Sequence, residues 1–269
     1  MIRNTFSILN GIGERFERRL WKAGILTWTD FINASDIDFL PVQKKNLFDE
    51  FLVSARQELE NANAEYFARN VKRREHWRLF DIFQGDAVCL DIETNGFMPS
   101  SGGVVTMVGL YDGLDYTCFV RGVNLAPEYL SEAFSGYKYL ITFYGSIFDI
   151  PFLLRSMPGL HFDIPHFDIC FGARKIGFKG GLKKLEVDLG IRRDESVQGM
   201  DGYDAVKLWE HAQQGSSEAL ELLQIYNKED TVNLFSLARH IYQGLRIQTG
   251  IEEYASRHNI LNTFFHNRI

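Results

Sequence analysis

Three acidic segments of the sequence carry the residue types that bind divalent metal ions. Asp91 and Glu93 end an apolar run and lie two residues apart, so the period of a strand puts both carboxylates on one face. Two carboxylates on an apolar strand are costly without a positive partner, and no Lys or Arg is near them in the sequence. Because hard cations take oxygen ligands, a divalent metal is a natural partner. The alternative is a strand-end pair that faces water.

Two further segments supply acids to the candidate set. Asp149 follows an apolar run at the predicted start of a helix, where an acid is also favourable simply as a first-turn residue. Tyr226 and Asp230 are four residues apart on a long predicted helix and therefore share one face. Each feature is common by itself, so only their combination is informative.

The elements that must position these residues follow from the apolar pattern. Four runs are typical of strands: 87–93, 104–111, 116–121 and 139–144. Five segments have the pattern of helices: 127–135, 147–156, 182–189, 203–213 and 217–242. Three adjacent strands, followed by a helix, a further strand and several helices, predict an α/β domain with a mixed sheet over residues 79–242. Residues 243–269 are weakly patterned, and no role is predicted for them.

The first 78 residues predict a small all-α module with a glycine turn near its start. Leu9-Asn10-Gly11-Ile12-Gly13 followed by a helix resembles a helix-hairpin-helix element. Two glycines allow the backbone to approach a phosphate, and the helix start offers free N–H groups. With Arg15 just beyond, Gly11 and Gly13 are predicted to contact nucleic acid without reading its sequence. The alternative is a helical hairpin whose glycines serve packing.

The acidic motifs in this order resemble the DEDD 3′–5′ exonucleases of the ribonuclease H-like superfamily, in the variant with Tyr before the last Asp. The resemblance covers residues 65–242, and segments 75–80 and 166–168 are most similar to a bacterial branch of predicted exonucleases. It implies a ribonuclease H-like mixed sheet flanked by helices. One position departs from the pattern, because many relatives have Asn where this sequence has Tyr144.

The resemblance also implies a mechanism. Asp91, Glu93, Asp149 and Asp230 would hold two divalent cations, Mg²⁺ or Mn²⁺, that activate water and stabilise the leaving oxygen. Tyr226 would orient the water, since a phenol with a pKa near 10 is a poor base at neutral pH. The substrate would be DNA or RNA, with a single-stranded 3′ end.

Asp168, in the motif-like segment His166-Phe167-Asp168, would support the metal ligands or cap a helix.

Two other functions remain open. One is a nucleic-acid-binding or scaffold protein that keeps the ribonuclease H-like fold without cutting. The other is a metal-dependent phosphoesterase for small nucleotides, which the basic character of residues 1–24 disfavours.

The charge distribution indicates which part of the chain could bind nucleic acid. The net charge of −6 argues by itself mildly against a protein that coats nucleic acid. Segment 174–193, however, has seven basic and two acidic residues. Such an island is ordinarily a solvated face, but beside a nuclease site it predicts substrate contact through Lys179, Lys183 and Lys184. Phe171 and Phe178 are candidates to stack on the bases of a single strand.

The remaining features indicate the compartment. The sequence has three cysteines, an odd number without metal-ligand spacing, which predicts reduced thiols. No apolar run approaches the ~18 residues of a membrane span. The first residues lack a signal-peptide pattern. A cytoplasmic protein without membrane contact is therefore expected.

Overall fold

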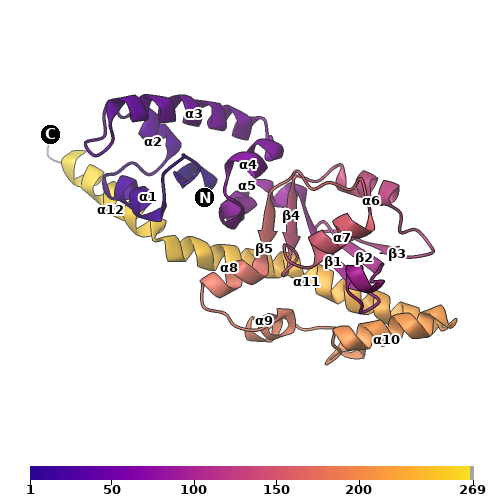
Figure 1. The fold of residues 1–269 in the computed structure, drawn as a ribbon. Helices are drawn as coiled ribbons and strands as arrows, with labels where there is room; N and C mark the ends of the chain where they lie inside the picture. Colours follow the sequence, from indigo (N-terminus) through magenta and orange to yellow (C-terminus); the bar gives the residue numbers. More distant parts are fainter. Residues whose placement is uncertain (267–269) are drawn as a thin grey trace. The chain divides into compact units, whose positions relative to one another are not determined.

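The computed structural model describes the backbone of residues 1–266 and the side chains of residues 1–258. The chain forms two compact units (Figure 1). The helical unit contains residues 1–83 and the chain from Tyr242 onward, and the sheet unit contains Gln84–Ile241. Residues 242–266, most of which lie in the segment for which the sequence predicted no role, are thus grouped with the N-terminal residues.

The helical unit is all-α, as expected. Its elements are η1 (Ile2–Asn4), α1 (Glu14–Lys22), α2 (Trp28–Asn33), α3 (Val42–Glu60), α4 (Ala64–Asn70), η2 (Arg73–Leu79), α5 (Phe80–Phe83), the end of α11 (Ser217–Thr249) and α12 (Ile251–His266). The fully buried Glu17 of α1 accepts the N–H of Phe6 at 2.7 Å and pairs with Arg78 of η2 at 2.9 Å. Tyr254 of α12 packs on Trp21 of α1, with ring centroids 6.0 Å apart. Polar and aromatic contacts therefore join segments that are distant in sequence.

The sheet unit has five strands in the order β3-β2-β1-β4-β5. They are β1 (Ala87–Thr94), β2 (Val105–Tyr111), β3 (Tyr116–Val120), β4 (Tyr139–Thr142) and β5 (His166–Asp168). β1–β2 and β2–β3 are antiparallel, whereas β1–β4 and β4–β5 are parallel. The predicted mixed sheet is confirmed. β5 was not expected from the sequence, because a strand of three residues is too short to show alternation.

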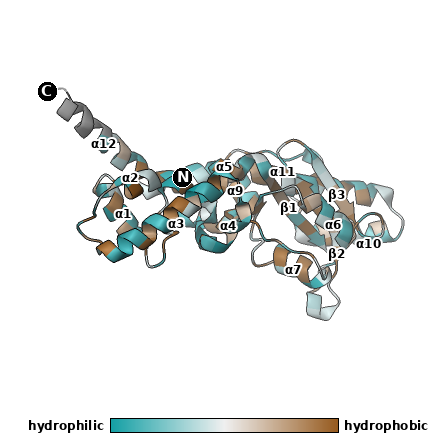
Figure 2. Ribbon diagram, turned by 90° about the horizontal axis from the view of Figure 1, so that it is seen from above, coloured by the Kyte–Doolittle hydropathy of each residue, from teal (hydrophilic) through white to brown (hydrophobic). Residues whose placement is uncertain are grey.

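Helices cover both faces of the sheet. The helices of this unit are α6 (Pro127–Phe134), α7 (Asp149–Ser156), α8 (Ile169–Lys175), α9 (Leu182–Asp188), α10 (Gly202–Gln213) and the first part of α11. It also contains the short 3₁₀ turns η3 (Gln84–Asp86), η4 (Pro99–Ser101) and η5 (Glu195–Val197). Val88, Leu90 and Ile92 of β1 pack in one core cluster with residues of α6 and α7; the apolar stretch of α7 is brown in Figure 2. A second cluster joins Met107 of β2 to residues of α10 and α11.

This alternation decides where the acids of β1 point. Glu93 pairs with Met107 in the antiparallel register, so both side chains lie on the face covered by α10 and α11. Asp91, two residues earlier, shares that face. The apolar residues that alternate with them, Leu90 and Ile92, face α6 and α7, as the period of two requires.

The three cysteines are unpaired; Cys89 and Cys170 are buried and Cys118 is half-buried. Within the described part of the chain, none of the helices combines the length and apolar character needed to cross a membrane.

Candidate active site

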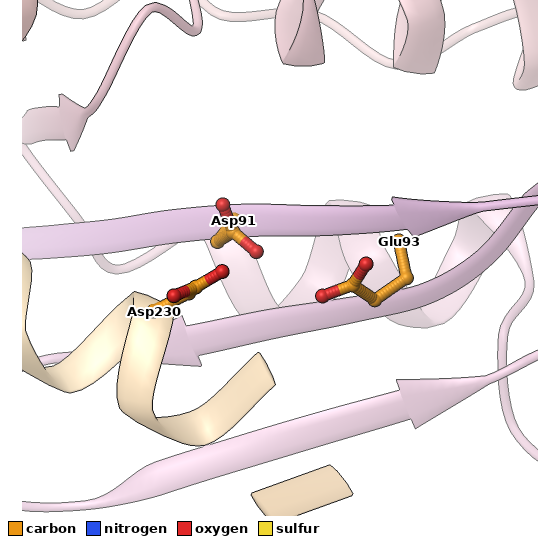
Figure 3. A group of neighbouring side chains, drawn as sticks. All are labelled: Asp91, Glu93 and Asp230. Carbon is orange, nitrogen blue, oxygen red and sulfur yellow. The ribbon is translucent and has the colours of Figure 1, made fainter. Parts of the chain in front are cut away.

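Three carboxylates converge between β1 and α11. Each of Asp91, Glu93 and Asp230 offers an oxygen that lies within 4.8 Å of those of the other two. Figure 3 shows the Asp230 carboxylate directed from α11 towards Asp91 on β1. Glu93 and Asp230 are buried and Asp91 is half-buried. Carboxylate oxygens at this spacing form a donor set that suits a hard divalent cation.

A glycine on β2 allows α11 to come this close. Gly109 pairs with Asp91 in the β1–β2 register, and a Cβ at this position would overlap the side-chain oxygen of Asn227 on α11. Asn227 uses the space to donate to Asp91 at 2.9 Å and to Glu93 at 3.4 Å, while accepting from the hydroxyl of Tyr116 at 2.8 Å. Neither Gly109 nor Asn227 was expected at the site from the sequence, although a glycine within an apolar strand is typical of a place where another segment approaches the backbone closely.

Asp149 lies beside this group rather than within it. It begins α7, as expected, and its Oδ1 accepts the backbone N–H of Ile92 at 3.2 Å. That N–H is available because the last pair between β1 and β4 is Cys89 with Ile141, so β1 continues past the end of β4. The bond fixes a fourth carboxylate next to the strand segment that carries Asp91 and Glu93.

An arginine that was not among the expected site residues balances part of this negative charge. Arg193 pairs with Asp230 and also with Glu186 of α9, through Nε–Oε2 at 2.6 Å and Nη2–Oε1 at 2.9 Å. Asn233 donates to the same Glu186 at 3.0 Å, and the Arg193 side chain is only 7% exposed. Glu186 therefore holds a guanidinium in a fixed orientation against a candidate metal ligand.

Tyr226 is paired with a lysine rather than left free. The Nζ of Lys183 donates to the Tyr226 hydroxyl at 2.9 Å, lies 4.7 Å from the centre of its ring, and also bonds to the carbonyl of Met200. Burial, followed by the charges of Asp230 and Glu93, raises the pKa of Tyr226 above its usual range. The phenol is therefore protonated at neutral pH and suited to donate a hydrogen bond.

Burial is also the main influence on the acids. It raises the pKa of Asp91 and Glu93 well above the ordinary range, and the charge of Asp230 adds to the effect on both. The pKa of Asp230 is also raised by burial, against the opposing influence of Arg193 and Lys183. Burial raises the pKa of Asp149 to about 7, although backbone hydrogen bonds oppose it. The cluster thus has a shortage of positive charge that a divalent cation would offset.

The shift at Asp149 predicts an unusual pH dependence of metal-free stability. Between an ordinary Asp pKa of about 3.9 and about 7, folded Asp149 holds a proton that the unfolded chain has released, so the free energy of unfolding falls as pH rises. His76 acts oppositely, since burial lowers its pKa to about 4 and its contribution is lost as pH falls below about 6.5. We therefore expect the stability of Asp149→Asn relative to wild type to increase by about 4 kcal/mol between about pH 4 and about pH 8.

Urea denaturation of both proteins in EDTA at the two pH values measures this difference directly, and His76 is common to both. A difference that is independent of pH would show that Asp149 titrates normally.

Arg193 gives a second prediction for stability. Arg193→Lys keeps the charge but cannot reproduce the forked contact with Glu186, so we expect a loss of about 1.5–3 kcal/mol in the free energy of unfolding. Chemical denaturation with EDTA measures it. Lys138→Met is the control, because its pair with Asp86 is on the surface. Equal effects of the two substitutions would contradict the ordered role of the guanidinium.

Asp168 has a local structural role. Its carboxylate accepts the N–H groups of Tyr144 at 2.8 Å and Ser146 at 3.0 Å, and it caps α8 by accepting from Cys170 at 3.2 Å. The structure shows the helix cap, which was one of the two roles expected for Asp168. The same carboxylate also holds the turn before α7.

The basic residues of segment 174–193 occupy different environments. Lys183 lies at Tyr226, as described above. Lys184 is exposed and pairs with Asp188, while Lys179 is exposed on the loop before α9. Only Lys183 of these three therefore contacts a residue of the expected catalytic set.

The glycine turn of the helical unit has part of the expected geometry. Gly11 has a left-handed φ of +81°, and Gly13 is the N-cap of α1 without a side chain to cap it. Gly11, Gly13 and Arg15 are all exposed. The element before the turn is η1, which is a single 3₁₀ turn of three residues.

Comparison with known proteins gives a family match for the sheet unit. A family model described as RNase_H superfamily matches residues 88–242, which include all four acids and Tyr226. A solved structure described as "apo form of the nuclease" has 22% sequence identity and a TM-score of 0.45, over 72% of this chain and 86% of that chain. No curated protein matches the sequence.

Proposed function

Because the chain belongs to the RNase_H superfamily, we propose that it is a metal-dependent nuclease that hydrolyses phosphodiester bonds of DNA or RNA. The five-stranded sheet with helices on both faces is the ribonuclease H-like fold expected from the sequence. Superfamily membership supports a nuclease-type function, and nucleases of this kind typically use divalent metals. The observation that carries the proposal is the convergence of Asp91, Glu93 and Asp230.

The residues present fit a hard divalent cation. All of the donors are carboxylate oxygens, which Mg²⁺ and Mn²⁺ prefer. Burial, together with the charges of neighbouring acids, raises the pKa of Asp91 and Glu93, and a bound cation would favour their ionised forms. Asp91, Glu93 and Asp230 would hold divalent metal, with Asp149 beside them as a fourth candidate ligand. Bound divalent ions would supply an activated water and stabilise the leaving oxygen.

The other residues of the site would orient what the ions bind. Asn227 keeps Asp91 and Glu93 in place through its two donated bonds. The protonated hydroxyl of Tyr226 would position the attacking water, and Lys183 would fix that hydroxyl. Arg193, held by Glu186, keeps Asp230 aligned and adds positive charge beside the phosphate.

The finer specificity rests on the order of the motifs. Asp-x-Glu on the first strand, Asp149 at the start of α7 and Tyr-x-x-x-Asp on α11 support a 3′–5′ exonuclease of the DEDD type with two metal ions. In the helical unit, exposed Gly11, Gly13 and Arg15 would contact the phosphate backbone, as N–H groups at a helix start favour anions.

A cleavage assay tests the proposal. Single- and double-stranded DNA and RNA, labelled at either end, are incubated with the full chain in Mg²⁺, Mn²⁺ or EDTA. We expect cleavage only with a divalent ion, with products that shorten stepwise from the 3′ end. Tight binding without cleavage under every condition would instead support the non-catalytic binding protein, and cleavage of mononucleotide esters alone would support the phosphoesterase.

A further inference from the structure

An exposed pair of aromatic rings lies beyond the carboxyl ends of β4 and β5. Tyr144 follows β4 and is 40% exposed, and Phe171 on α8 is 44% exposed. Their ring centroids are 6.1 Å apart, with the planes inclined by 30°. The guanidinium of Arg174 lies 5.8 Å from the first ring and 5.7 Å from the second. Tyr144, Phe171 and Arg174 are called the aromatic platform below.

Asp168 fixes both halves of the aromatic platform. The same carboxylate accepts the backbone N–H of Tyr144 and caps the helix that carries Phe171 and Arg174. The hydroxyl of Ser146 donates a further bond to it at 2.6 Å. The rings therefore have a defined relative position before a ligand arrives, which reduces the entropy lost on binding.

The backbone of Tyr144 is strained. Its φ is +66°, in the left-handed region that a residue with a bulky side chain rarely adopts and that Asn or Gly occupies more easily. Non-glycine residues held in this region cluster at ligand-binding and active sites. The turn thus tolerates an unfavourable residue whose ring is exposed.

The aromatic platform lies at the same edge of the sheet as the carboxylates. Asp149, five residues after Tyr144, bonds to the N–H of Ile92, which separates Asp91 from Glu93 on β1. The parallel strands β1, β4 and β5 direct their carboxyl ends to this edge. Arg174 adds positive charge there, which complements a phosphate backbone.

We propose that the aromatic platform stacks on an unpaired base of the nucleic-acid substrate close to the bond that is cut, and so selects single strands. This inference rests on the proposed nuclease function. Every base has a flat π-face, so exposed aromatic rings bind single strands without reading their sequence. The planar guanidinium of Arg174 adds a cation–π contact. A base paired and stacked within a duplex does not present that face.

Binding variants provide the test. Fluorescence anisotropy measures the affinity of the full chain for a short labelled single-stranded DNA and RNA in EDTA, which prevents cleavage. We expect Phe171→Ala to weaken binding by about 5- to 150-fold, with an unchanged dependence on salt because no phosphate contact is lost. Tyr144→Asn should weaken binding without lowering thermal stability, since Asn relieves the left-handed strain. Tyr129→Ala, at a 56% exposed tyrosine on α6, is the matched control and should bind as wild type.

An abasic series identifies stacking as the cause. A single abasic nucleotide is moved along the strand, and at one position Phe171→Ala should cause no further loss, because the base that it contacts is already absent. An equal loss with intact and abasic strands at every position would overturn the proposal, as would wild-type affinity of both variants.

The cleavage assay separates this inference from the proposed function. If the wild-type chain does not cut any nucleic acid with Mn²⁺ but the variants lose single-strand affinity as described, the nuclease proposal fails and the platform is supported. If the wild-type chain cuts and both platform variants bind and cut normally, the platform fails and the nuclease stands.

Discussion

Asp91→Asn is expected to abolish phosphodiester hydrolysis while making the metal-free protein more stable. Asp91 belongs to a group of three carboxylates within 4.8 Å, so its loss removes a ligand from the candidate metal site. Losing a ligand that supports charge stabilisation costs several kcal/mol, which lowers the rate by roughly 10³-fold or more. Asn keeps the shape of Asp and an oxygen that can accept the bond from Asn227.

Asp91→Asn is expected to raise the stability of the metal-free protein, although it abolishes activity, and the reason is electrostatic. Burial and the charges of Asp230 and Glu93 raise the pKa of Asp91, which means that its ionised form is unfavourable in the folded chain. A neutral residue removes that penalty, so we expect the free energy of unfolding at about pH 8 in EDTA to increase by on the order of 1 kcal/mol.

Activity and denaturation are measured on the same preparation of Asp91→Asn. Asp163→Asn is the control, because Asp163 is exposed in the loop before β5. It should change neither quantity. Full metal-dependent activity in Asp91→Asn would remove Asp91 from the catalytic site, and a strong loss of stability would show that Asp91 supports the metal-free fold rather than straining it.

The parts of this molecule that were predictable are those in which local sequence determines structure. The strand that ends in Asp91 and Glu93 was identified because its apolar residues are contiguous and its acids are two apart. β5 was missed because it has only three residues. Contacts such as that of Tyr254 with Trp21, rather than any local pattern, place α12 with the N-terminal residues.

In the candidate site, too, the side-chain contacts between distant segments could not be predicted from local sequence. Asn227 meets Asp91 across 136 positions of sequence, and only the glycine on β2 allows that approach. Lys183 was expected on the basis of charge to contact nucleic acid, yet it bonds to Tyr226, 43 positions away. Arg193 was present in the same basic segment, but nothing local indicated that it pairs with Asp230. Such partners follow from how α10 and α11 pack on the sheet and how α9 contacts α11.

Tyr226→Phe is expected to lower kcat by about 10²- to 10³-fold with little change in KM, which is the cost of losing one hydrogen bond made to the reacting groups. The substitution removes only the hydroxyl, and the ring remains packed in the core cluster with Met107 and Trp209. Tyr203→Phe, at an exposed tyrosine of α10, is the control and should retain the wild-type kcat.

The pH profile of this variant distinguishes orientation of the water from proton abstraction. Burial is the largest cause of the raised pKa of Tyr226, and the carboxylates add to it. Metal ions would offset the carboxylate charges but not the burial, so the phenol should stay protonated at neutral pH even in the loaded enzyme. Wild type and Tyr226→Phe should therefore have pH–rate profiles of the same shape, displaced only in height. If wild type instead shows a limb that Tyr226→Phe lacks, the hydroxyl titrates in the reaction, and Tyr226 acts as the base rather than as a fixed donor.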